Sequence, residues 1–141
     1  MRIPHEVMVV VRRGGEFLVV HRAPAFDAYW HLVSGGVEAG ETARDAALRE
    51  LREEVELDLG ELLDLERRFS YPLAGESEFV RSRYDPSVTE VVVDAFLAEA
   101  PAGWEPTLNE EHDEYRWCWA DEAERLLFWP EPREVVREVA G

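Results

Sequence analysis

A run of glutamates between residues 41 and 54 carries the residue types best suited to chemistry in this chain. Arg49 and Glu50 are followed by Glu53 and Glu54, and Glu41 lies upstream of them. Residues three and four apart are neighbours on an α-helix, so Glu50, Glu53 and Glu54 would share one face. Each like-charged pair at that spacing destabilises a helix by about 0.2–0.5 kcal/mol. A solvated outer face tolerates that effect, so the cluster alone does not separate surface charge from a ligand site.

The loop in front of this cluster offers a second kind of ligand. Ser34, Gly35, Gly36 and Gly40 allow the backbone to bend tightly and to turn carbonyl oxygens toward a bound group. Mg²⁺ prefers a few carboxylates, retained waters and the oxygens of a substrate phosphate. A cation would also relieve the repulsion between the glutamates. These residues therefore favour a Mg²⁺ site that binds a phosphate substrate, with Mn²⁺ as the alternative metal.

The spacing of these residues resembles the Nudix box. The pattern Gly-x5-Glu-x7-Arg-Glu-apolar-x-Glu-Glu-x-Gly-apolar is matched from Gly35 to Leu57 at every defined position except the last glycine, which is Glu56 here. Glycine at that point normally supplies a left-handed helix cap, so the helix is expected to end at Gly60 instead.

The resemblance to the Nudix family implies a role for each residue of the box. It makes Glu50, Glu53 and Glu54 metal ligands. It also implies that Arg49 orients Glu50 and that Glu41 supports the site. A backbone carbonyl of Ser34 or Gly35 would complete the ligand set.

The elements that must position these residues indicate one α/β domain spanning residues 1–141. The apolar periodicity from Thr42 to Val55 predicts a helix, with Thr42 as N-cap and Asp45 as its acidic capping partner. β-Branched runs around Gly14-Gly15 predict a hairpin over Glu6 to Arg22. The other predicted elements are a short strand at His31 to Ser34, strands in "LLDLERRFSYP", "EFVRSRY", "TEVVVDAFLAEA" and "YRWCWA", and helices over Asp121 to Phe128 and Pro132 to Val139. This order accords with the α/β/α sandwich around a mixed β-sheet that the resemblance implies.

Outside the box, four segments are similar to parts of the dihydroneopterin triphosphate pyrophosphatases within this family. The segments are "WHLVSGGVEAGET", "RSRYDPSVTE", "EEHDEYRWCWADEAERL" and "FWPEPREVVREV". The third segment makes Glu111 the additional acid that the family often supplies from a distant loop, as a metal ligand or base. Glu110 and Glu114 are the alternatives, and an acid in a loop is more often plain surface.

Several other residues bear on the substrate. Pro72 lies where ADP-ribose pyrophosphatases of the family tend to carry proline, although a proline that ends an edge strand is common. Arg81 and Arg83 alternate along a predicted strand, where they could grip a polyphosphate or pair with acids. The aromatic residues that could stack on a flat heterocycle, each individually more often core, are Phe26, Tyr29, Trp30 and Tyr84. The histidines His21, His31 and His112 lack metal-ligand spacing and are interpreted as structural.

The expected reaction is attack of water on phosphorus in a small phosphate anhydride, with Glu53, Glu54 or Glu111 as the base. The favoured substrate is dihydroneopterin triphosphate, which would give the monophosphate and pyrophosphate. The alternatives are ADP-ribose, another nucleoside diphosphate derivative or a (deoxy)nucleoside triphosphate. A protein of a different class, a non-catalytic Nudix domain that senses a nucleotide, is the remaining hypothesis.

Composition limits the partners and the compartment. The formal net charge is -16, with 31 acids against 15 bases, and such a surface repels a nucleic-acid backbone. The apolar runs are too short to span a bilayer, and the N-terminus lacks the pattern of a signal peptide. Cys118 is the single cysteine. We therefore expect a cytoplasmic monomer or homodimer that binds neither nucleic acid nor membrane.

Overall fold

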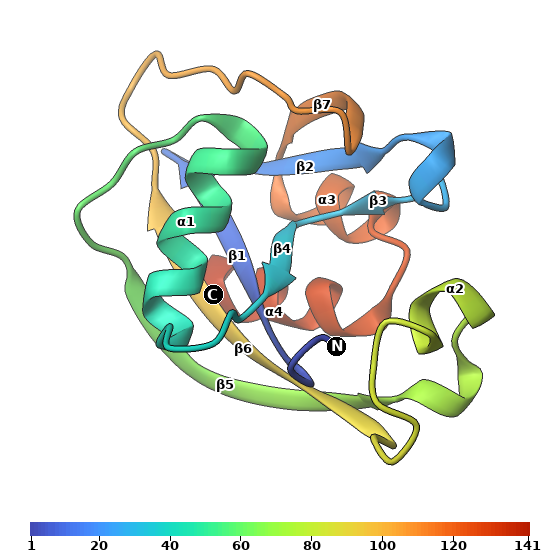
Figure 1. Ribbon diagram of the computed structural model, residues 1–141. Coiled ribbons are helices and arrows are strands. Elements are labelled where there is room, and N and C mark those ends of the chain that lie inside the picture. The colour runs from blue at the N-terminus through green and yellow to red at the C-terminus, as the bar shows by residue number, and fades with distance from the viewer.

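The computed structural model describes residues 1–141, and a mixed seven-stranded sheet forms its centre (Figure 1). The strands are β1 (His5–Arg13), β2 (Glu16–Arg22), β3 (Trp30–His31), β4 (Val33–Gly36), β5 (Leu63–Pro72), β6 (Glu90–Glu99) and β7 (His112–Cys118). The helices are α1 (Ala43–Val55), α2 (Glu78–Arg81), α3 (Ala120–Leu126) and α4 (Pro130–Ala140), with short 3₁₀ helices η1 (Pro24–Phe26) and η2 (Leu73–Gly75). None of these helices combines the length and apolar character needed to cross a membrane.

The pairing of β1 with β4 places Gly35 and Gly36, which precede the box acids in the sequence, beside the first residues of β1. The main strand order is β3-β2-β1-β6-β5, with β4 on β1 and β7 on β2. β1 runs parallel to β6, whereas its pairs with β2 and β4 are antiparallel. The first half of β1 pairs with β4, so that Glu6 lies opposite Gly36, and its last residues pair with β2. The N-terminus of the chain is thereby brought next to the Nudix box.

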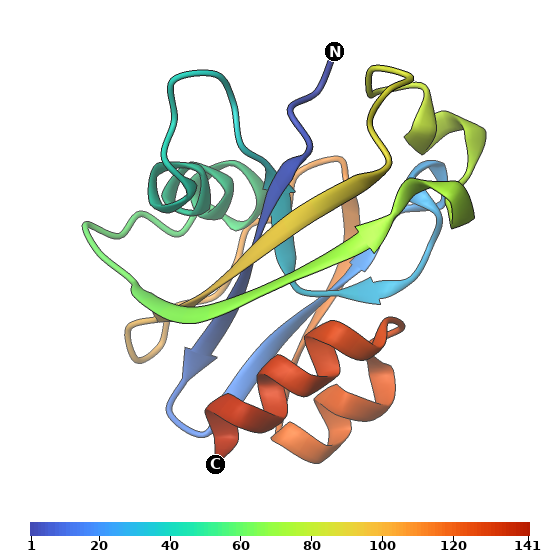
Figure 2. The ribbon, with the colours of Figure 1, turned by 90° about the horizontal axis from the view of Figure 1, so that it is seen from below.

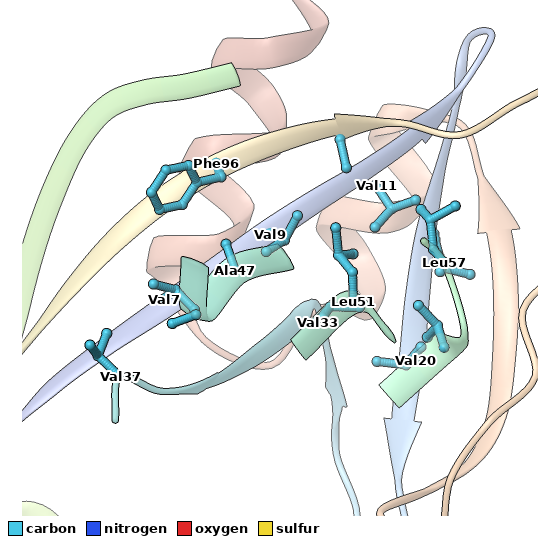
Figure 3. Packing of buried hydrophobic residues seen from close by; sticks show 14 residues of the cluster. Val7, Val9, Val11, Val20, Val33, Val37, Ala47, Leu51, Leu57 and Phe96 are labelled. Atoms are coloured by element: carbon cyan, nitrogen blue, oxygen red, sulfur yellow. The ribbon is translucent and has the colours of Figure 1, made fainter. Parts of the chain in front are cut away.

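Two apolar layers cover the two faces of the sheet. Side chains alternate along a strand, so Val7, Val9 and Val11 of β1 face one way and Met8 and Val10 the other. The first set packs with α1 in one buried cluster (Figure 3). The second set packs with buried residues of α3 and α4. Figure 2 shows α1 and the α3–α4 pair on opposite sides of the sheet, which confirms the predicted α/β/α sandwich.

Helix α1 begins as the sequence predicts but ends earlier. The Thr42 hydroxyl accepts from the Asp45 amide, and the Asp45 carboxylate accepts from the Thr42 amide, forming a capping box. The helix ends at Val55, because Glu56 itself adopts the left-handed conformation with φ 58°. The Leu57 amide then donates to the Leu51 carbonyl (3.1 Å). The expectation that Gly60 ends the helix is therefore wrong.

The segment "EFVRSRY" is not a strand. Its first four residues form the short helix α2, which begins where the Ser77 hydroxyl accepts from the Val80 amide (3.3 Å). β5 and β6 pair directly with each other from Pro72 and Glu90 inward, so this segment is the connection between them and has no partner strand. Arg81 and Arg83 therefore do not alternate on a strand face.

Candidate active site

Arg49 organises the acids of the Nudix box. Its Nε and Nη2 donate to the two carboxylate oxygens of Glu41 (2.6 and 3.0 Å). Its Nη1 donates to Glu50 Oε1 (2.8 Å) and Glu53 Oε2 (3.1 Å), while Nη2 also donates to the Gly36 carbonyl (2.8 Å). These contacts hold the pKa of Glu41 below its ordinary value and raise the pKa of Arg49. The guanidinium thus fixes the carboxylates of Glu41, Glu50 and Glu53 and the Gly36 carbonyl relative to one another.

Glu50 and Glu54 are buried although both are acids. Their exposed fractions are 8% and 3%. Gly35 is required for this arrangement, because a Cβ at that position would stand 2.1 Å from the Glu50 carboxyl carbon. Burial raises the pKa of both carboxyls, and the neighbouring Glu50 raises that of Glu54 further. Glu53, in contrast, leaves 55% of its side chain exposed.

The loop that precedes β7 adds another acid to the site. The amides of Thr107 and Asn109 donate to the carbonyls of Val55 and Glu54 at the end of α1 (3.1 and 3.3 Å). This docking brings Glu111 to the box. The other two acids considered in the sequence lie elsewhere: both are exposed and line neither hollow described below, and the second ion-pairs with Arg116 (3.8 Å); they are Glu110 and Glu114.

His112 lies closer to the acids than the sequence indicates. Ligand atoms of Glu54, Glu111 and His112 lie within 4.8 Å of one another, and His112 Nε2 is 3.7 Å from Glu54 Oε1. Burial lowers the pKa of His112 to about 4, so its ring is neutral at pH 7. His31 is also held neutral, because burial lowers its pKa to about 3. His21, the third histidine considered in the sequence, is hydrogen-bonded to Asp113 (2.7 Å).

The donor set fits a divalent cation. Two buried carboxylates whose ionisation is disfavoured would be stabilised in their charged form by an adjacent positive charge. Glu50 and Glu54 supply these carboxylates, with Glu53 and Glu111 beside them. Oxygen donors of this kind suit Mg²⁺ or Mn²⁺.

Two hollows meet at this site. The smaller, about 460 Å³, is lined by the box acids. The larger, about 880 Å³, is of the size that takes a small organic ligand. The two share five lining residues, which are Arg2, Ser34, Gly35, Arg83 and Glu111. A ligand that occupied both would pass between two guanidiniums.

The four residues predicted to bind substrate differ in position. Arg83 lies at the junction, and among the arginines lining the hollows it is the one without a hydrogen-bond acceptor or ion-pair partner. Burial, and then the charge of Arg2, lower its pKa. Tyr84 lines the larger hollow but is only 3% exposed. Arg81 and Trp30 line neither hollow: Arg81 donates to the Glu76 carbonyl, and Trp30 packs on His21 with its ring centroid 5.1 Å away.

Other residues of the larger hollow have no signal in a local motif. Its aromatic side chains include three predicted for stacking, Phe26, Tyr29 and Tyr84, and others that the sequence did not indicate, which are Phe69, Tyr71, Phe79, Phe128 and Trp129. Arg2 and Glu6 also line it, and the pairing of the start of β1 with β4 and β6 brings them there.

Comparison with known proteins agrees with this arrangement. The family model of the NUDIX domain matches residues 2–139. The chain is 34% identical over 114 residues to the dihydroneopterin triphosphate diphosphatase of Escherichia coli strain K12, covering 78% of this chain and 73% of that protein. It is 33% identical over 137 residues to an octanoyltransferase of Myxococcus xanthus, covering 96% of this chain but spanning only 36% of that protein. The structure of the E. coli dihydroneopterin triphosphate pyrophosphohydrolase matches with a TM-score of 0.85 and 28% identity, over 99% of this chain and 96% of that one. The chain therefore belongs to the Nudix family of hydrolases.

Proposed function

We propose that this protein is a Mg²⁺-dependent pyrophosphohydrolase that converts dihydroneopterin triphosphate to the monophosphate and pyrophosphate. The observation that carries the proposal is the meeting of the carboxylate-lined hollow with a larger aromatic-walled hollow at Arg2 and Arg83. A triphosphate fits the first and the junction, and a flat ring fits the second. The relatives with this activity in their names favour the pterin compound among flat substrates.

The metal would be held by Glu50, Glu53 and Glu54, with Glu111 and the Gly35 carbonyl as further donors. Bound Mg²⁺ supplies positive charge to the phosphate oxygens and makes the attacking water more acidic. The protein's own part is to hold these carboxylates in place through Arg49.

The phosphate chain would be oriented by the two junction arginines. Arg83 has no carboxylate partner, so its guanidinium is free to donate to phosphate oxygens. Arg2 is held by Glu6 (3.2 Å) and keeps further N–H donors. Attack of water on a phosphorus forms a new P–O bond, the anhydride P–O bond breaks, and pyrophosphate leaves.

Glu111 is the proposed acceptor of the water's proton. Of the three candidate bases, it alone lines both hollows and therefore lies where the reacting phosphorus would sit. Glu54 is buried and better suited to ligation, and Glu53 lines only the smaller hollow.

The experiment is a substrate panel. The purified protein is incubated with Mg²⁺ and dihydroneopterin triphosphate, nucleoside triphosphates, ADP-ribose or dinucleoside polyphosphates, and released pyrophosphate and phosphate are measured. We expect the highest kcat/KM with the pterin triphosphate, pyrophosphate as the released product, and no turnover in EDTA. A higher kcat/KM with ADP-ribose would contradict the proposal that dihydroneopterin triphosphate is the preferred substrate. Measurable binding without turnover of any compound would favour the nucleotide-sensing alternative.

A further inference from the structure

Glu6 lines the larger hollow, and the proposed reaction does not use this acid. Alternation along β1 places Glu6 on the same face as Met8, toward α4, and the side chain keeps 21% of its surface exposed. The Tyr71 hydroxyl donates to its Oε1 (2.7 Å) and Arg2 Nη2 donates to its Oε2 (3.2 Å). The Tyr84 hydroxyl also reaches Oε2, at 3.5 Å, which is long for an O–H···O hydrogen bond. A carboxylate oxygen accepts about two hydrogen bonds, so Oε1 retains capacity for another donor, and a closer donor on Oε2 would take the place of the long contact from Tyr84.

The surroundings of Glu6 define what this hollow takes. Rings of Tyr29, Phe128 and Trp129 contact one another, with centroids 4.9 to 6.1 Å apart, and form an aromatic wall. Phe128 is 56% exposed, which leaves ring surface free for stacking. Glu76 lines the same hollow, and after burial the charge of Glu6 is the next cause that raises its pKa. This part of the hollow is flat-walled and rich in acceptors.

We propose that Glu6 selects the flat group of the substrate by accepting hydrogen bonds from paired N–H donors on its edge. The inference rests on the proposed function, because it names the part of the substrate that the larger hollow binds. A carboxylate presents two acceptors in one plane. An amidine-like edge, in which a ring N–H adjoins an amino group, presents two matching donors, as in guanine and pterin rings. Rings that lack this edge gain no such pair of hydrogen bonds from the carboxylate.

The Glu6 carboxylate is also connected to the residues that would bind the phosphate chain. Arg2 joins Glu6 to the junction between the hollows, and the Arg2 amide donates to the Arg83 carbonyl (2.7 Å). Arg2 also fills the space beside Gly36, where a Cβ would stand 2.5 Å from its Nη2. A ring seated on Glu6 would therefore lie next to the arginines that meet its phosphate chain.

The first test uses the unaltered protein. GTP and ITP differ only in the amino group that completes the donor pair, so their ratio isolates it. We expect kcat/KM for GTP to exceed that for ITP by roughly 10- to 100-fold, the effect of one hydrogen bond to a charged group. Dissociation constants from calorimetry give the same ratio if neither compound is hydrolysed. Absence of turnover of dihydroneopterin triphosphate in the substrate panel would count against the proposed function, whereas equal affinities for GTP and ITP would overturn the role of Glu6.

The second test changes the acid. Glu6→Gln keeps an acceptor for Tyr71 but replaces the second oxygen with a donor, so the GTP/ITP ratio should fall toward one. The matched control is Glu114→Gln, the same chemical change at an exposed acid that lines neither hollow. The control should keep the ratio of the unaltered protein. An unchanged ratio in Glu6→Gln, or an equal loss in Glu114→Gln, would overturn the proposal, and the first test stands if Glu6→Gln does not fold.

Discussion

At the scale of single residues, the acids of the site differ in burial and position. Glu50 and Glu54 are buried and fixed by their surroundings, whereas Glu111 is half-buried at the junction of the two hollows. Its amide donates to the side-chain oxygen of Asn109 (3.2 Å), and the Asn109 side-chain nitrogen donates to Glu111 Oε2 (3.4 Å). Oε1 of Glu111 is left available to substrate.

The first prediction concerns Glu111. Replacing it with glutamine keeps its size and removes its ability to accept a proton, so kcat should fall by about 100-fold or more. Steady-state release of pyrophosphate measures this. The neighbouring Glu110 is exposed and lines neither hollow, so Glu110→Gln provides the control and should retain full activity. A kcat within a few-fold of the unaltered protein in Glu111→Gln would assign the base to another carboxylate.

The second prediction concerns the burial of Glu54. Its pKa in the folded protein is raised above the unfolded value of 4.5, so the metal-free protein loses stability as the pH rises from 4.5 through the folded pKa. Glutamine does not titrate. In EDTA at pH 8, Glu54→Gln should therefore melt at a higher temperature than the unaltered protein, by roughly 3 °C for about 1 kcal/mol.

Thermal melts at pH 5 and pH 8 provide the measurement for Glu54. The difference between the variant and the unaltered protein should be larger at pH 8 than at pH 5. Adding Mg²⁺ should reverse the order at pH 8, because only the unaltered protein keeps the full ligand set. A difference that is equal at both pH values would show that ionisation of Glu54 does not oppose folding.

The sequence could predict site residues that lie close together along the chain, but not those that only strand pairing brings together. The box acids follow a fixed spacing on one helix, so the sequence places Glu50, Glu53 and Glu54 together. Arg2 and Glu6 reach the same site because the start of β1 pairs with β4 and β6, and no local spacing records these pairings. These two residues therefore could not be found from the chain alone.

At the scale of elements, the same reasoning explains which segments were predicted. The capping box of α1 and the hairpin turn at Gly14-Gly15 depend on neighbouring residues, and both were predicted from them. The segment 78–84 carries strand-forming residues, but the direct pairing of β5 with β6 leaves it no partner. Its helix begins at the cap that Ser77 provides. Propensity alone thus could not decide its structure, because a strand requires a neighbour.

The third prediction belongs to the end of α1. Glu56 is exposed and holds a left-handed conformation that disfavours any residue with a Cβ. Glu56→Gly should stabilise the protein by about 1 kcal/mol, as measured by urea unfolding. Glu56→Ala removes the same charge but keeps the Cβ, so it should gain much less. Equal stabilities of the two variants would show that charge, and not backbone conformation, sets the effect.

At the scale of the whole molecule, the net charge of -16 makes every cation stabilising to some degree. Salt screens repulsion between surface acids irrespective of the ion's identity, with a Debye length of about 10 Å at 0.1 M ionic strength. A specific site adds a second effect, because an ion that binds only the folded state shifts the unfolding equilibrium by mass action. The two effects can be separated by comparing salts at equal ionic strength.

The last prediction uses that comparison. MgCl₂ at about 100 times its dissociation constant should stabilise the protein by roughly 2.7 kcal/mol through binding, which no equal ionic strength of NaCl provides. The melting temperature should therefore rise by several degrees more in MgCl₂ than in NaCl. The double variant Glu50→Gln/Glu54→Gln retains most of the surface charge but lacks two ligands, so it should respond to both salts alike. If the unaltered protein also responds alike, the stabilisation comes from screening of the acidic surface and the box acids hold no cation.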